Sequence, residues 1–178
     1  SKKRNKYVSK FGLSAYDARV ISDEINMANF FEETVANGAE AKLASNWVTS
    51  DIVGYLKANK LSFNQLKLSP RNLAEMINMI SKNTISGKIA KEILPELIEK
   101  NISPKQLVEE RGLAMISDSS SILPIINELI TEHPNEVQAF RNGKTKLLGF
   151  FVGQLMKRTK GKADPKLANK LLAEKLNS

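Results

Sequence analysis

Four cations around one glycine are the strongest chemical signal in this sequence. They lie in Lys157-Arg158-Thr159-Lys160-Gly161-Lys162, and Asp164-Pro165 follows at once. The macrodipole of a helix favours one or two cations at its C-terminus, but it gives no reason for four. Cations on a turn can contact consecutive phosphates, which supplies affinity for a nucleic acid without reading its bases. The predicted backbone-binding residues are Lys157, Arg158, Lys160 and Lys162, flanked by Lys144 and Lys146.

Gly143-Lys144-Thr145 looks like the end of a nucleotide-binding phosphate loop, and the sequence around it argues against that function. Such a loop needs another glycine five residues before Gly143, where this chain has Gln138. It also needs a preceding strand, whereas residues 136–141 have the pattern of a helix. We therefore expect no nucleotide site and no cofactor here.

Other reactive residue types are present but not in catalytic arrangements. His133 is the only histidine and has no cysteine or paired carboxylates nearby in the sequence, so it is a poor metal ligand. The adjacent acids Glu32-Glu33 and Glu109-Glu110 diverge by about 100° on a helix and form no convergent pair. No histidine or lysine is placed to activate Ser119-Ser120-Ser121. The sequence predicts neither a catalytic nor a metal site.

The net charge of +8 is concentrated at one end of the sequence. Residues 1–140 hold 17 Lys and Arg and 17 Asp and Glu, whereas residues 141–178 hold ten cations and only Asp164 and Glu174 as acids. Such clustering favours attraction to a polyanion, although a solvated basic tail is the alternative interpretation.

The composition and the capping signals predict an all-α protein. Leu, Ile, Ala, Lys and Glu are abundant, aromatic residues make up 6%, and there is no cysteine. No apolar stretch is long enough to span a membrane, and the basic N-terminus has no apolar segment after it, so we expect no secretory signal. The predicted helices after residue 60 cover residues 70–81, 85–99, 103–110, 119–132, 134–141, 143–159 and 164–177.

Helix starts and internal glycines lead to more detailed expectations. Ser14 is predicted to cap one helix, and Ser22 another that runs through Phe31 to Asn37-Gly38. Residues 39–56 are predicted to form one longer helix. Gly149 and Gly153 lie on one helical face, which favours a close approach by another helix, and the adjoining apolar stripe holds Phe151 and Leu155. Phe150 lies beside this stripe, where it could pack in the core or stack on a base.

A polar segment divides the chain into two predicted domains. A helix ends at Gly112, and Ser117-Asp118 with the serines after it precedes the next helix. We therefore predict two consecutive small helical domains, residues 1–112 and a basic domain of residues 113–178.

The segment from Gly143 to Pro165 resembles the C-terminal signature of the B subunits of aspartyl/glutamyl-tRNA amidotransferases and the tail module of YqeY-like proteins. Agreement extends along nearly the whole chain. It includes Phe11-Gly12-Leu13, Tyr16-Asp17-Ala18, Phe30 to Glu33, Ala41 to Val48, Ile85 to Lys88 and Val108 to Leu113. The departures from the family pattern are conservative: Phe11 stands where the family usually has Tyr, Ser45 where it has Ala, Phe151 where it has Leu, and Asp164 where it has Asn. None of them removes a cation from the tail.

The resemblance implies that this chain is a C-terminal fragment, a helical domain followed by a YqeY-like tail that helps to bind tRNA. The catalytic domain of the complete protein would bind ATP and Mg²⁺, and the enzyme would convert Glu-tRNA(Gln) or Asp-tRNA(Asn) to Gln-tRNA(Gln) or Asn-tRNA(Asn) with ammonia from glutamine. The A and C subunits of the amidotransferase would be its partners. The fragment alone would have no enzymatic activity, and we expect a cytoplasmic protein, or an organellar one in a eukaryote.

A protein-interaction module is the alternative function. The neutral residues 1–112 could dock on other amidotransferase subunits or on another part of the same chain. The helix of Trp47 and the face of Gly149 and Gly153 are the candidate contacts. In that case the fragment would bind little RNA by itself.

Overall fold

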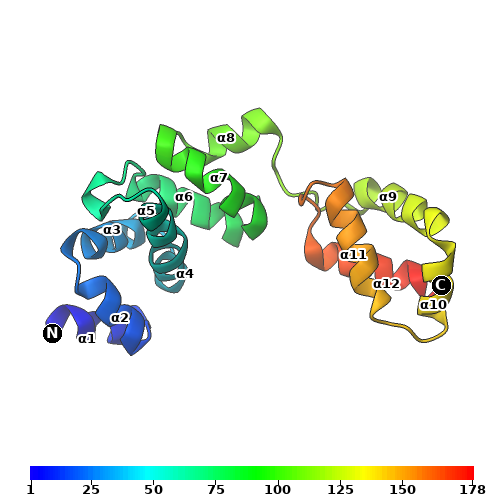
Figure 1. Ribbon diagram of the computed structural model, residues 1–178, viewed down its shortest axis with the longest axis horizontal. Coiled ribbons are helices and arrows are strands. Elements are labelled where there is room, and N and C mark those ends of the chain that lie inside the picture. Colours follow the sequence, from blue (N-terminus) through cyan, green and yellow to red (C-terminus); the bar gives the residue numbers. More distant parts are fainter. The chain divides into compact units, whose positions relative to one another are not determined.

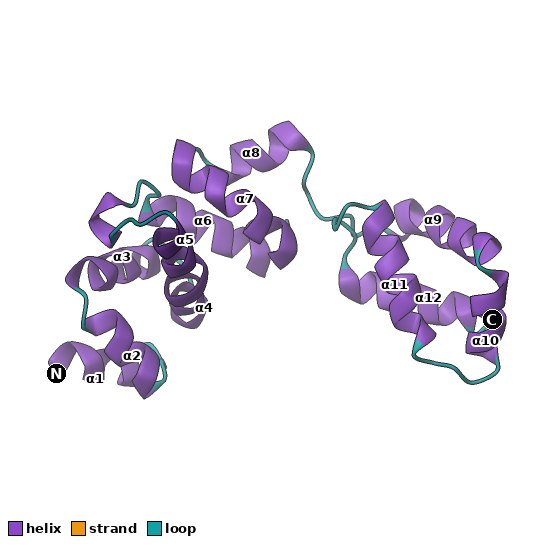
Figure 2. Cartoon of the chain, in the orientation of Figure 1, coloured by secondary structure: helices purple, strands orange, loops and turns teal.

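The computed structural model describes residues 1–178 and is built from helices (Figures 1 and 2). The all-α prediction is confirmed: there is no strand, only an isolated parallel bridge between Ile116 and Ala163. None of the helices is long and apolar enough to cross a membrane. The helices are α1 (Lys2–Ser9), α2 (Ala15–Ser22), α3 (Ile25–Ala36), α4 (Ala41–Asn46), η1 (Trp47–Ile52), α5 (Val53–Ala58), η2 (Phe63–Gln65), α6 (Pro70–Ser81), α7 (Gly87–Lys100), α8 (Pro104–Arg111), α9 (Ser119–Glu132), α10 (Pro134–Arg141), α11 (Leu147–Arg158) and α12 (Pro165–Leu176).

The chain forms two compact units. The first contains Ser1–Lys82 and Ala90–Gly112, and the second contains Asn83–Ile89 and Leu113–Ser178. The second unit therefore includes a short segment, Asn83–Ile89, that precedes Gly112 in the sequence. The predicted division into residues 1–112 and 113–178 places this segment in the first domain. That segment ends in the first turn of α7.

In the first unit, α1 and α2 pack on each other, and α3 contacts α2, α4 and α6. Three aromatic rings join α1 to α3. Tyr7 and Phe31 are fully buried, with ring centroids 5.2 Å apart and edge to face, and Phe11 lies 5.9 Å from Tyr7. Such edge-to-face pairs are a favoured aromatic geometry, so these rings fix the position of the short α1.

In the second unit, the four helices α9 to α12 all contact one another. Their shared core includes Ile126 and Leu129 from α9, Phe151 and Leu155 from α11, and Leu172 from α12, all with no exposed surface. The spacings of three and four residues place each set on one helical face. This core positions the ends of α11 and α12 that carry the predicted site.

Most predicted helix starts are confirmed. The hydroxyls of Ser14, Ser69 and Ser103 accept hydrogen bonds from backbone N–H groups at the starts of α2, α6 and α8, and Asp164 caps α12. The prediction for Ser22 is wrong, because Ser22 ends α2. The Glu24 carboxylate caps α3 instead, accepting from the N–H groups of Asn26 and Met27. A carboxylate suits this position because it also complements the helix dipole.

Two predicted helices differ from the structure. The helix expected over residues 39–56 runs from Ala41 to Ala58, with a π-helical middle from Trp47 to Ile52. Trp47 in this stretch is only partly buried. The helix expected from residue 143 begins at Leu147, because Gly143 has φ of +109° and lies outside helical conformation.

The prediction that another helix packs closely against the two glycines of α11 is wrong. Gly149 and Gly153 are exposed, and a β-carbon at either would meet nothing within 4 Å. The opposite face of α11, with Phe151 and Leu155, packs into the core. Phe150 is half-buried and packs against this core.

Candidate nucleic-acid interface

The turn after α11 has a fixed backbone conformation. The N–H of Gly161 donates to the Met156 carbonyl at 2.7 Å, and that of Lys160 donates to the Lys157 carbonyl at 3.2 Å. These two bonds form a Schellman motif, in which the residue after the helix cap is left-handed. That residue is Lys160, with φ of +53°, and Gly161 follows with φ of +77°.

Thr159 and Ile116 hold the far side of this turn. The Thr159 side chain is buried, and its hydroxyl donates to the Leu155 carbonyl and accepts from the N–H of Ala163 at 3.2 Å. The N–H of Ile116 donates to the Lys162 carbonyl at 2.8 Å, and the N–H of Asp164 donates to the Ile116 carbonyl at 2.9 Å. The turn is therefore tied to the segment that precedes α9.

The start of α7 forms a third support, which the sequence did not predict. The Ser86 hydroxyl donates to the Gly161 carbonyl at 3.4 Å, and the Lys88 side chain lies against Gly161. Ile85 to Lys88 matched the family resemblance, but local sequence gives no signal that they meet a turn more than 70 residues later. Lys88 is exposed, so it adds a cation beside the turn.

The predicted lysines of the turn differ in their surroundings. Lys157 and Lys160 are exposed and form no ion pair, while Lys162 is half-buried. An exposed ammonium with no carboxylate partner remains available to a phosphate. The structure thus brings Lys157, Lys160, Lys162 and Lys88 to one turn.

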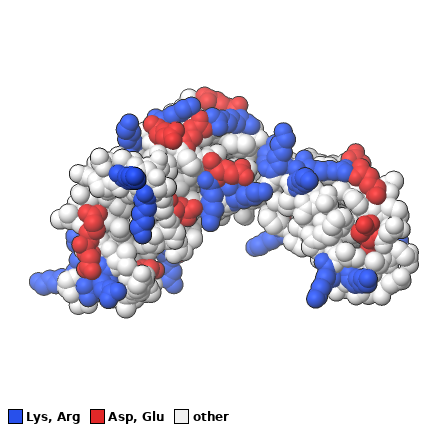
Figure 3. Space-filling model, viewed as in Figure 1, with Lys and Arg blue, Asp and Glu red and all other residues white.

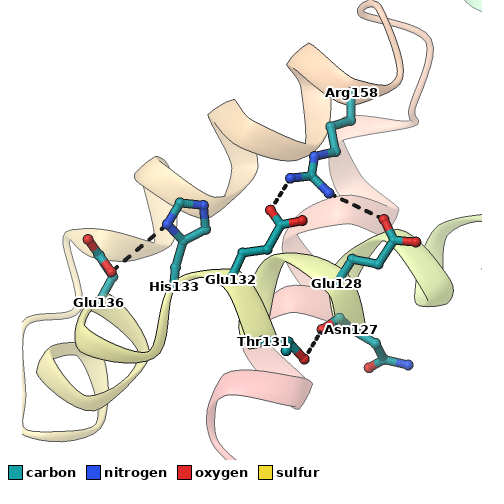
Figure 4. Close-up of polar contacts among 7 residues, drawn as sticks. All are labelled: Asn127, Glu128, Thr131, Glu132, His133, Glu136 and Arg158. Carbon is teal, nitrogen blue, oxygen red and sulfur yellow. Dashed lines mark hydrogen bonds and ion pairs between the residues drawn. The ribbon is translucent and has the colours of Figure 1, made fainter.

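Arg158 has protein partners. Its Nη1 lies 3.2 Å from Oε2 of Glu128, and its Nη2 contacts Oε2 of Glu132, both on α9 (Figure 4). The hydrogen bond to Glu132, with the charge of Glu128, raises the pKa of Arg158 above its usual value. A guanidinium held between two carboxylates is less available to phosphate than the neighbouring lysines.

Lys144 and Lys146 lie away from this turn. Both are exposed in the segment before α11, and a rise of 1.5 Å per helical residue puts about 16 Å between Lys146 and Lys157. Figure 3 shows Lys and Arg side chains gathered near both ends of α11. The six predicted residues therefore form two groups.

His133, the only histidine, makes structural contacts. His133 joins α9 to α10, and its ring packs edge-on against Phe150, with centroids 5.1 Å apart. Its Nδ1 lies 4.0 Å from a Glu136 carboxylate oxygen (Figure 4). No group of three or more His, Cys, Asp or Glu residues in residues 1–178 could hold a metal ion.

Comparisons with known proteins agree with this architecture. A family model described as the GatB domain matches residues 29–176. A protein of Prochlorococcus marinus strain MIT 9312, named as the B subunit of an aspartyl/glutamyl-tRNA(Asn/Gln) amidotransferase, is 93% identical over 177 residues, which cover 99% of this chain. A protein of the same name from strain NATL2A is 61% identical over 176 residues. The chain spans 36% of the length of either relative.

Proposed function

This chain belongs to the GatB domain family, and on that premise we propose that it is the tRNA-holding part of the B subunit of an aspartyl/glutamyl-tRNA amidotransferase. The turn between α11 and α12 binds the tRNA backbone. The complete enzyme converts Glu-tRNA(Gln) or Asp-tRNA(Asn) to the amidated form with ATP and glutamine, and the A and C subunits are its partners. The relatives are bacterial proteins, so the cytoplasm is the proposed location.

The pair of exposed, unpaired lysines on an immobilised turn is the observation that carries this proposal. The hydrogen bonds that involve Thr159, Ile116 and Ser86 fix the backbone that presents Lys157 and Lys160. A fixed scaffold lowers the entropy lost when these side chains meet phosphates. Because ammonium groups contact the backbone as point charges, this turn supplies affinity and position, and no base specificity.

The charge of the second unit supports the same conclusion. It holds eleven Lys and Arg against six Asp and Glu, a net +5. This is less than the +8 of residues 141–178, because the rest of the unit adds the four acids Asp118, Glu128, Glu132 and Glu136 and only one cation, Lys88. The positive field of the unit still favours binding of a polyanion. Within the unit, the turn between α11 and α12 has the backbone that is held by the most hydrogen bonds described above.

The test is a salt titration of tRNA(Gln) binding to the 178-residue chain. Replacing Lys157 and Lys160 with Gln should weaken binding at low salt and reduce the slope of log K against log salt by about 1 per lysine. The matched control replaces Lys60 and Lys105, exposed lysines of the first unit, and it removes the same charge.

A larger loss of tRNA affinity in the Lys157 and Lys160 variant than in the control supports binding at the turn. Equal losses in the two variants mean that only net charge matters, and they overturn the assignment of the turn. If the unmodified chain binds no tRNA even at low salt, the alternative function, docking on other amidotransferase subunits, is favoured instead. Copurification with the A and C subunits then becomes its test.

A further inference from the structure

Tyr16 is the only exposed aromatic residue of the eleven in this chain, with 66% of its surface accessible. It lies in the first turn of α2, and the Arg19 guanidinium lies over its ring, 5.8 Å from the centroid. Aromatic rings of this size usually contribute to stability by burial, which Tyr16 does not. An exposed ring next to a guanidinium is a surface on which a nucleobase can stack.

A recess of about 300 Å³ lies beside this ring, and its walls are Arg4, Ala15, Tyr16 and Arg19. That volume is at the lower end of the range for small-ligand sites. Two of the four lining residues are arginines, from different helices. The recess therefore combines an aromatic platform with two guanidinium groups.

Arg4 forms one ion pair within the protein and is otherwise partly exposed, with 39% of its side chain accessible. Its Nη2 donates to an Asp23 carboxylate oxygen at 3.3 Å, whereas its Nε is buried and has no hydrogen-bond partner. Buried N–H groups of charged side chains are normally paired, because an unsatisfied one costs free energy. This Nε is enclosed by protein, so a phosphate oxygen in the recess would meet the exposed part of the Arg4 side chain instead.

The surrounding charge favours an anion. Helices α1 and α2, with the segment between them, carry six Lys and Arg against Asp17, and two of these cations have partners from outside the segment, Arg4 with Asp23 and Lys6 with Glu32. Figure 3 shows these cations gathered over α1 and α2. The remainder of the first unit has ten Lys and Arg against twelve acids, so its whole positive excess lies on these two helices. The net charge of residues 1–140 is zero, so the sum over that range does not reveal this basic patch.

We propose that the recess between α1 and α2 binds one unstacked nucleotide of an RNA. The base stacks on Tyr16, and Arg4 and Arg19 hold its phosphate. This inference rests on the proposed function, that the chain binds tRNA, and it adds a second contact on the first unit. Stacking is tolerant of base identity, so the site selects a single-stranded nucleotide rather than a sequence.

The experiment measures binding of an unpaired ten-nucleotide RNA to the 178-residue chain and its variants. Tyr16→Ala should weaken binding about five-fold or more, and Tyr16→Phe should stay within about two-fold, because it keeps the ring. Arg19→Gln should also weaken binding, whereas Lys105→Gln, at an exposed lysine on α8, should change it little. Ultraviolet crosslinking should attach the oligonucleotide to the peptide that contains Tyr16.

The outcomes separate this inference from the proposed function. If Tyr16→Ala binds the oligonucleotide unchanged and the crosslink lies elsewhere, the nucleotide site is refuted, while a loss of tRNA affinity in the Lys157 and Lys160 variant preserves the proposed function. Binding of poly-glutamate that depends on Tyr16, without binding of RNA, would assign the recess to an acidic protein and also refute it. Circular dichroism checks that each variant is folded.

Discussion

The side chain of Lys88 lies against Gly161, although more than 70 positions of sequence separate them. A β-carbon built on Gly161 would be 3.3 Å from Cδ of Lys88 and 3.7 Å from its Nζ. The Ser86 hydroxyl also donates to the carbonyl of Gly161. The glycine thus permits the first turn of α7 to pack on the turn that carries the candidate lysines.

Substituting Gly161 should therefore loosen this contact. Gly161→Ala places an L side chain at φ of +77° and against Lys88, so we expect a loss of about 1–2 kcal/mol in the free energy of unfolding. Gly153→Ala is the matched control, because it lies in an exposed helical position with nothing within 4 Å. It should gain about 0.5–1 kcal/mol. Urea unfolding measures both, and equal effects would contradict the assigned role of Gly161.

Lys160 has a structural twin that separates backbone strain from binding. Lys60 follows α5 in the same motif, with φ of 54° against 53° for Lys160, and the N–H of Leu61 donates to the Leu56 carbonyl. Replacing either lysine with glycine should raise stability by about 0.5–1 kcal/mol, because glycine adopts this conformation without strain. Only Lys160→Gly should weaken tRNA binding in a filter assay. A comparable loss in Lys60→Gly would mean that this position of the turn has no special part in binding.

The helical fold was largely predictable from local signals. Serine or aspartate before proline set the starts of α6, α8 and α12, and these features act within one turn of helix. The errors arose where tertiary structure decides. The π-helical stretch from Trp47 to Ile52 has no marker in the sequence, and Glu24 took the capping role assigned to Ser22 because its carboxylate reaches two free N–H groups.

The candidate site was predictable only in part. The sequence located the turn of Lys157 to Lys162, since a glycine and a capping aspartate mark it. It could not show that Arg158 faces Glu128 and Glu132, because that depends on how α9 packs beside α11. For the same reason the contribution of Lys88 was missed, and summing charge along the chain overstated the basic field.

The cap of α9 leads to a prediction about acid. Hydrogen bonds from Ser121 and Ser120 lower the pKa of Asp118 below its usual value of 3.8. A depressed pKa in the folded state means stability that is present above the unfolded pKa and lost as the pH falls through the folded one. Asp118→Asn keeps a capping oxygen but cannot titrate. The stability difference between the wild-type chain and Asp118→Asn, measured by thermal unfolding, should shrink as the pH falls below about 4. A difference that is constant from about pH 7 to about pH 2.5 would contradict this account.

The two acids that hold Arg158 should restrain RNA binding. Replacing Glu128 and Glu132 with Gln removes both ion pairs and two negative charges beside the turn. The freed guanidinium can then meet a phosphate, so we expect tighter tRNA binding and a salt slope larger by about 1. The charge-matched control replaces Glu92 and Glu99, exposed acids of α7 that form no ion pair. If this control gains as much affinity as the α9 variant, net charge alone explains the effect. If adding Arg158→Gln to the α9 variant removes its advantage over the control, the gain came from Arg158.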